Sequence, residues 1–81
     1  MTNIVKIGTV ELTADEAFRL YENHKYIVTY SKIYQLFYSQ AQQCVYGRPI
    51  YESPGLARRG RFHTLTGAEI NRLLGVQLVN E

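Results

Sequence analysis

The sequence predicts one small α+β domain, in which a short sheet packs against helices. Stretches rich in β-branched residues, beginning with residues 4–12, favour strands. Two Thr-x-x-Glu motifs mark helix starts, and the longest periodic segment, residues 31–47, fits a further helix. The 81 residues are 46% hydrophobic and 20% charged. This is the composition of a single globular domain spanning residues 1–81.

The expected order is strand, helix, strand, core helix, basic loop, strand, helix, strand (β-α-β-α-loop-β-α-β). We expect a sheet of three or four mostly antiparallel strands, with about three helices covering one of its faces. A domain of this length buries only a modest core, so a homodimer that buries more apolar surface stays open as an alternative.

Residues 4–12 form the first predicted strand. The apolar residues of this stretch surround Gly8, which suits a bulge or a tight hairpin at that glycine. A helix is predicted directly afterwards, because Thr13 can accept a hydrogen bond from the backbone N–H three residues on while Glu16 reaches back to the N–H of Thr13. Its buried stripe consists of Ala14, Ala17, Phe18 and Tyr21.

Residues 25–30 fit two structures. Ile27, Val28 and Thr29 favour a strand, whereas four tyrosines recur with helical spacing: Tyr26, Tyr30, Tyr34 and Tyr38. We expect a short strand, and the alternative is a core helix that begins near residue 26. The tyrosine series would also suit the stacking of nucleic-acid bases. We instead place these tyrosines at the edge of the core, where tyrosine commonly keeps its hydroxyl in water.

Residues 31–47 are predicted to form the core helix. At about 100° per residue, an arc of roughly 200° collects the apolar side chains, which include Ile33, Leu36, Phe37, Ala41, Cys44 and Val45. A strand would leave both faces mixed. Ser31 is placed as the N-cap and Gly47 as the end of the helix. The opposite polar side is a secondary candidate binding face, made by Gln35, Ser39, Gln42 and Tyr46.

Residues 47–61 are predicted to form a long basic loop. They contain two prolines and three glycines and have no hydrophobic period. A loop of this length in so small a domain is typically functional or mobile. The net charge of the chain is only +2, but the loop and its flanks hold one acid, Glu52, beside four arginines: Arg48, Arg58, Arg59 and Arg61.

The end of the chain predicts a strand at residues 61–64 and then a second capping box, formed by Thr66 and Glu69. Gly75 would close this helix, and residues 76–79 alternate as a final strand should. Its buried side is expected to hold Ile70, Leu73 and Leu74. The two helix starts resemble each other, and we interpret this as ordinary helix-start chemistry rather than as a duplicated strand-to-helix unit.

The basic loop is the main candidate binding site. Its arginines, with aromatic residues nearby, suit phosphates and stacked bases. They also suit an acidic protein surface, because arginine and tyrosine are enriched in protein–protein hot spots. A solvated loop that binds nothing is the third interpretation. The candidate residues are Arg48, Tyr51, Arg58, Arg59, Arg61, Phe62 and His63.

Signals of catalysis are weak, and we expect neither an enzyme nor a cofactor. Neither His24 nor His63 has an acidic residue at metal-ligand spacing. Cys44, the single cysteine, falls on the apolar side of the predicted helix, where a thiol is normally inert. A Cys44–His63 pair formed by the fold stays open. A phosphate at the last helix start is disfavoured, because Glu69 repels an anion there.

We expect a cytoplasmic protein without membrane contact. No apolar run approaches the roughly 20 residues of a membrane span, and the N-terminus lacks the pattern of a signal peptide. A lone cysteine fits a reducing compartment.

Together these signals favour a small non-catalytic binding protein that occupies a surface of a larger protein or nucleoprotein complex, as accessory regulators and phage-type inhibitors do. The alternative is a nucleic-acid-binding protein that uses the arginine-rich loop 48–61. A small enzyme is the least favoured alternative. Salt separates the first two, because binding to phosphates weakens steeply as salt rises.

Overall fold

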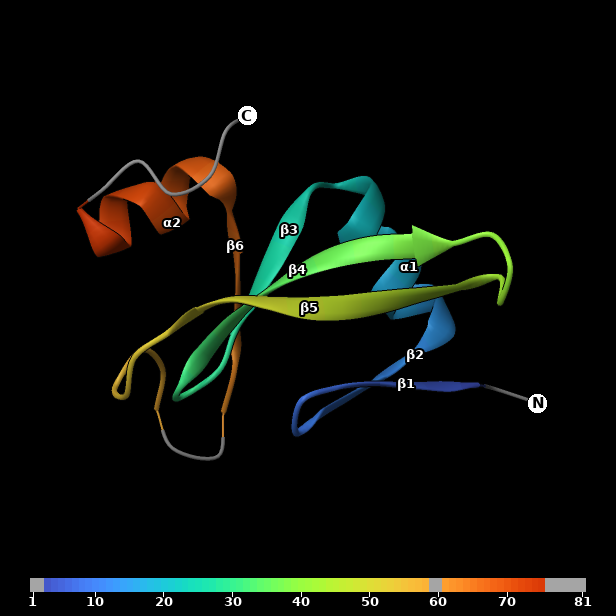
Figure 1. Cartoon of the computed structure of the whole chain (residues 1–81), viewed down its shortest axis with the longest axis horizontal. Helices are drawn as coiled ribbons and strands as arrows, with labels where there is room; N and C mark the ends of the chain where they lie inside the picture. Colours follow the sequence, from blue (N-terminus) through green and yellow to red (C-terminus); the bar gives the residue numbers. More distant parts are fainter. Residues whose placement is uncertain (1–2, 59–60, 76–81) are drawn as a thin grey trace.

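The computed structural model describes residues 3–58 and 61–75 (Figure 1). It confirms the α+β class, with a two-stranded sheet and a four-stranded sheet, but the described residues contain two helices rather than about three. The predicted element order is also wrong. The elements are β1 (Ile4–Ile7), β2 (Val10–Thr13), α1 (Ala14–Glu22), β3 (Lys25–Val28), β4 (Lys32–Ser39), β5 (Cys44–Glu52), β6 (His63–Thr66) and α2 (Gly67–Leu74).

The N-terminal strands β1 and β2 form an antiparallel hairpin that turns at Gly8. The backbone of Gly8 has a φ of 64°, a region that side chains other than glycine rarely adopt. Space is also lacking, since a Cβ atom at this position would lie 2.5 Å from the Tyr34 hydroxyl oxygen. The hairpin alternative of the sequence analysis is therefore confirmed.

Both predicted capping boxes are present. The Glu16 N–H donates to Thr13 Oγ1 at 3.1 Å, and the Thr13 N–H donates back to the Glu16 carboxylate at 3.1 Å. In α2 the equivalent distances between Thr66 and Glu69 are 3.3 and 2.9 Å. The helix α2 ends as expected at Gly75, whose φ is 72°. The two helix starts follow strands of different sheets, β2 and β6.

The predicted core helix at residues 31–47 is wrong, because this segment forms most of the β4–β5 hairpin. The register runs from the pair Lys32 and Glu52 to the pair Ser39 and Cys44. The segment contains four aromatic residues, which pack well across strands: Tyr34, Phe37, Tyr38 and Tyr46. Gly47 lies inside β5 and ends no helix.

The larger sheet has the order β5-β4-β3-β6, and each neighbouring pair is antiparallel. This agrees with the expected sheet of three or four mostly antiparallel strands. The ambiguous segment at residues 25–30 contains strand β3, so the strand interpretation is confirmed. Strands β3 and β4 are central and supply much of the core.

The two faces of the larger sheet bury separate apolar clusters, because side chains alternate along a strand. The first cluster lies against α1 and the β1–β2 hairpin and contains Ile7, Val10, Leu12, Ala17, Ile27, Tyr34, Leu36 and Val45. The second includes Ile70 of α2 and consists of Tyr26, Val28, Ile33, Ala57 and Ile70. The helices therefore cover opposite faces, and the expected one-sided arrangement is wrong. In Figure 1, α1 lies behind β4 and β5, whereas α2 lies at the other end of the sheet.

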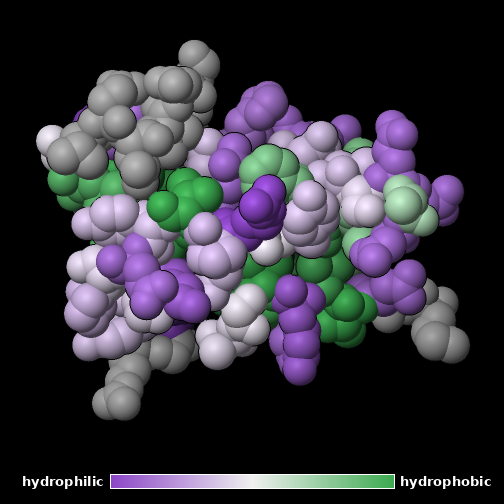
Figure 2. Space-filling model, viewed as in Figure 1, coloured by the Kyte–Doolittle hydropathy of each residue, from purple (hydrophilic) through white to green (hydrophobic). Residues whose placement is uncertain are grey.

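Some residues predicted to be buried in helices are exposed. Phe18 of α1 is 42% exposed and meets Tyr38 edge-on, with ring centroids 5.9 Å apart. Leu73 of α2 is 50% exposed. On the face seen in Figure 2, hydrophobic side chains reach the surface in small areas between hydrophilic ones.

The predicted basic loop at residues 47–61 is shorter than expected, because β5 continues to Glu52. Two residues after β5 also pack against the rest of the domain. The Leu56 N–H donates to the Tyr30 carbonyl at 3.0 Å, and Ala57 is buried in the second cluster. The predicted final strand at residues 76–79 lies outside the described residues. Neither described helix has the length and apolar character needed to cross a membrane.

Candidate functional site

The structure divides the predicted binding residues among several places. Arg58 and Arg61 are exposed on the connection before β6, where the Arg61 N–H donates to the Arg58 carbonyl at 3.0 Å. Phe62 and His63 follow them and are exposed. Tyr51 is half-buried against the second cluster, and Arg48 lies on β5. Arg59 lies outside the described residues.

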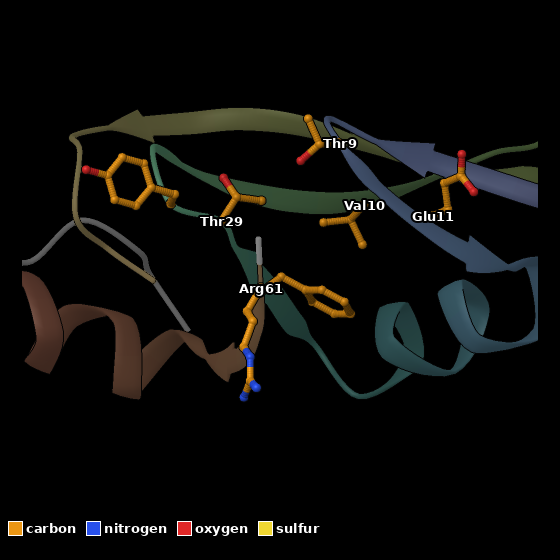
Figure 3. Close-up of a pocket in the computed structure, with 7 residues that line it drawn as sticks. Thr9, Val10, Glu11, Thr29 and Arg61 are labelled. Atoms are coloured by element: carbon orange, nitrogen blue, oxygen red, sulfur yellow. The ribbon is translucent and has the colours of Figure 1, made fainter. Parts of the chain in front are cut away.

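A cleft of about 340 Å³ opens where three turns meet (Figure 3). It is lined from the β1–β2 hairpin, from the β3–β4 turn and from the residues just before β6. The lining residues are Thr9, Val10, Glu11, Thr29, Tyr30, Arg61 and Phe62. The loop residues Arg61 and Phe62 are thus brought together with five residues that the sequence analysis did not assign to a site.

Hydrogen bonds fix the turn between β3 and β4 that forms one wall of the cleft. The Thr29 hydroxyl donates to the Lys32 carbonyl at 3.0 Å and accepts from the Lys32 N–H at 3.1 Å. The carbonyl of the next residue, Tyr30, accepts from the Leu56 N–H. This wall is therefore pre-organised, and the Thr29 hydroxyl is already engaged in hydrogen bonds within the turn.

The side chains of the cleft combine aromatic surface with charges of both signs. Tyr30 is 44% exposed and Phe62 is 39% exposed, beside the buried side chain of Val10. In Figure 3 the Arg61 side chain extends away from Val10. The Glu11 carboxylate lies 3.6 Å from Lys6 Nζ in an exposed ion pair.

The residues that line the cleft include few groups used in catalysis. Its lining holds one carboxylate, from Glu11, and neither histidine nor cysteine. A nucleophile paired with a base is the minimum arrangement for covalent catalysis, and these seven residues do not supply one.

The predicted secondary face is brought together on the β4–β5 hairpin, although not on a helix. Alternation along the two strands places Gln35, Ser39, Tyr46 and Arg48 on one face of the sheet. Gln42 is in the turn, where its N–H donates to Ser39 Oγ at 3.3 Å.

Phe37, which was not predicted to be a binding residue, also lies on this face. Its ring stacks on Tyr46, with centroids 5.7 Å apart and planes 29° apart, and Arg48 Cζ lies 5.7 Å from the Phe37 centroid. We call Gln35, Phe37, Tyr46 and Arg48 the aromatic–arginine face. Reading the segment as a strand would have found it, because the odd positions of β4 share a side.

Cys44 and His63 do not form a pair in the structure. Cys44 begins β5 and His63 begins β6, and these are the opposite edge strands of the larger sheet. Cys44 is half-buried, with Sγ 3.7 Å from Gln42 Oε1, so its predicted burial on an apolar helix face is wrong. Within residues 3–58 and 61–75, no three His, Cys, Asp or Glu side chains gather as metal ligands.

No protein-family model matches this chain, and no curated protein or solved structure matches it either. Two surfaces of the molecule are candidates for its function. The cleft contains the loop residues Arg61 and Phe62, and the aromatic–arginine face contains Arg48.

Proposed function

We propose that this chain is a small non-catalytic binding protein whose cleft docks onto a larger protein or nucleoprotein complex. One observation carries the proposal: Tyr30 and Phe62, each more than one-third exposed, line the same cleft as Arg61. Tyrosine and arginine are the residue types that dominate protein–protein hot spots. Such a protein would act by occupying its partner's surface, as an accessory regulator or an inhibitor does.

The cleft is suited to this role because part of it is rigid before binding. The hydrogen bonds of Thr29 and the contact between Leu56 and Tyr30 hold the β3–β4 turn. A pre-organised wall loses less conformational entropy on association. Covering the exposed rings of Tyr30 and Phe62 would then add favourable burial of apolar surface.

The charges of the cleft favour a protein partner over nucleic acid at this site. Arg61 attracts carboxylates and phosphates equally, but the ion pair between Glu11 and Lys6 also places charges of both signs at the cleft, which a uniformly negative phosphate backbone does not match. A protein segment with charges of both signs can satisfy both side chains. Nucleic-acid binding through the arginine-rich loop is therefore the alternative that the experiment has to distinguish.

The test is affinity purification of the full chain from its native host, with and without nuclease. The bait with Arg61→Glu and Phe62→Ser should lose the partner. A matched control changes an exposed cation and an exposed apolar residue on α2, Arg72→Glu with Leu73→Ser, and should keep it. Each bait is first checked for folding by circular dichroism.

The proposal is supported if the partner still co-purifies after nuclease treatment and with the control bait, but is lost with the cleft bait. Loss of the partner with nuclease would assign the cleft to nucleic acid. Retention of the partner by the Arg61→Glu, Phe62→Ser bait would show that the cleft is not the docking surface. Binding of the purified partner should also weaken only gently with salt, because few phosphates are involved.

A further inference from the structure

The aromatic–arginine face forms a second surface that shares no residue with the cleft. Phe37 and Tyr46 are directly paired across β4 and β5, and Phe37 contacts both the Tyr46 ring and the Arg48 guanidinium. Gln35 is the pairing partner of Arg48. Two rings, a guanidinium and an amide thus lie side by side on two neighbouring strands.

This part of the sheet is open to solvent. The helix α1 and the β1–β2 hairpin pack on the opposite face, which buries Leu36 and Val45. On the same face, α2 and Ala57 cover the residues around Val28 and Ile33. In Figure 1 no helix lies in front of the long arms of β4 and β5, and Figure 2 shows mixed polar and apolar side chains over them. Tyr46 remains 39% exposed.

The charge of this surface is positive. The only acid in β4 and β5 is Glu52, which pairs with Lys32 at the far end of the strands. Lys32 precedes Ile33 of the second cluster, so alternation places the pair on the opposite face. The aromatic–arginine face therefore carries the cation of Arg48 and no carboxylate.

We infer that the aromatic–arginine face binds single-stranded nucleic acid. Aromatic side chains on an open antiparallel sheet are a stacking platform for unpaired bases. Tyr46 offers its exposed ring to a base, and Arg48, steadied by the Phe37 ring, has guanidinium N–H groups for a neighbouring phosphate. The amide of Gln35 can donate to and accept from a base edge.

A single strand fits this face better than a duplex or a protein. Bases inside a duplex are already stacked on each other and cannot reach Tyr46. A stable protein interface buries about 800 Å² per partner around an apolar centre. The four residues here supply two half-covered rings with polar groups beside them, which matches one or two stacked nucleotides.

A tryptophan reporter gives a direct test, because the chain has no tryptophan. The Tyr46→Trp variant is titrated with a mixed-sequence single-stranded oligonucleotide of about 12 nucleotides at about 50 mM salt. The matched control is Tyr38→Trp, since Tyr38 is 37% exposed but pairs with Val45 and faces the first cluster. Saturable quenching is expected for Tyr46→Trp and none for Tyr38→Trp.

Affinity measurements on further variants test the roles of the two side chains. Tyr46→Leu should raise Kd about 5- to 150-fold, the range expected for loss of one stacked base, while Tyr46→Phe keeps the ring and the affinity. Arg48→Gln should lower the salt slope of log K by about 0.7, as loss of one phosphate contact on a single strand does. Circular dichroism and thermal melts establish that each variant is folded, and the exposed Arg48 is changed without disturbing the core.

Equal quenching in both tryptophan variants, no quenching in either, or equal affinity for duplex and single strand would overturn the inference. It would also be overturned if a polyglutamate peptide, and not the oligonucleotide, quenched Tyr46→Trp, because the face would then recognise protein. The cleft variant Arg61→Glu, Phe62→Ser should bind the oligonucleotide like the unmodified chain, which keeps this test separate from that of the proposed function.

Discussion

Gly47 of β5 and Ile7 of β1 are packed so closely that a Cβ atom on Gly47 would lie 2.5 Å from Ile7 Cγ2. Ile7 is fully buried, and this contact joins the N-terminal hairpin to the larger sheet. The glycine is required here because nothing larger fits against the isoleucine.

Gly47→Ala should lower the free energy of unfolding by about 1–3 kcal/mol, the usual cost of an extra methyl group in a packed core. In an Ile7→Ala background, which by itself costs about 2–5 kcal/mol, the same change should cost much less. Urea unfolding of the four proteins measures this coupling. Additive losses would show that the two residues do not press on each other.

Ile33→Ala should cost about 2–5 kcal/mol of stability, because Ile33 is completely buried in the second cluster. Phe37→Ala should cost only about 1–2 kcal/mol, since its ring is partly exposed and loses mainly the stack on Tyr46. Chemical denaturation compares the two. A loss of about 3–5 kcal/mol for Phe37→Ala is the value for a core helix position and would contradict the exposed hairpin face.

Thr13→Ala and Thr66→Ala should each lower stability by about 0.5–2 kcal/mol, because each removes a side-chain acceptor at a helix N-terminus. Thr9→Ala, an exposed threonine in the β1–β2 turn, is the control and should change stability by less than about 0.5 kcal/mol. Thermal melts in one buffer suffice. A neutral Thr66→Ala would mean that this cap contributes nothing to α2.

Acid should weaken the start of α2. Hydrogen bonds from the Thr66 backbone N–H and hydroxyl hold the pKa of Glu69 below its usual range, and the charges of Lys25 and Arg72 lower it further. The folded state therefore prefers the ionised carboxylate. Its contribution to stability is present above the carboxyl pKa of the unfolded chain and is lost as the pH falls through the lowered pKa of the folded chain.

Glu69→Gln keeps an acceptor oxygen for the capping box but cannot titrate. The free energy of unfolding of this variant should therefore fall less than that of the unmodified chain between about pH 6 and about pH 3. Urea titrations across this range give the comparison. Parallel curves for the two proteins would show that Glu69 does not contribute to the acid sensitivity.

Local chemistry predicted the helix starts and the first hairpin, because Thr13, Thr66 and Gly8 act on backbone groups a few residues away. The β4–β5 hairpin was missed for two physical reasons. The neighbouring residues Ile33 and Tyr34 of β4 are both buried, on opposite faces of the sheet, which removes the polar alternation of a strand at this point. Its turn at residues 40–43 also lacks glycine, proline, asparagine and aspartate, and Gln43 takes the positive φ of 53° instead.

The candidate surfaces were predictable only in part. Exposure and charge pointed to Arg61 and Phe62 in the connecting loop. No local sequence pattern indicates that they lie beside Thr9 and Tyr30, which belong to two other turns. Phe37 was assigned to the core because a helical period placed it beside Leu36, whereas the two residues lie on opposite faces of the sheet.

The position of β6 determines when the sheet can be completed during synthesis. Strand β3 pairs with β4 through a short turn. Its other neighbour, β6, follows much later in the chain, since Val28 of β3 pairs with His63. Until β6 emerges from the ribosome, the fully buried residues Ile27 and Val28 belong to an open edge strand. An apolar edge of this kind recruits other chains. A chain that stops before residue 63 should therefore aggregate, because it lacks β6 and α2, which cover this edge and part of one face of the sheet.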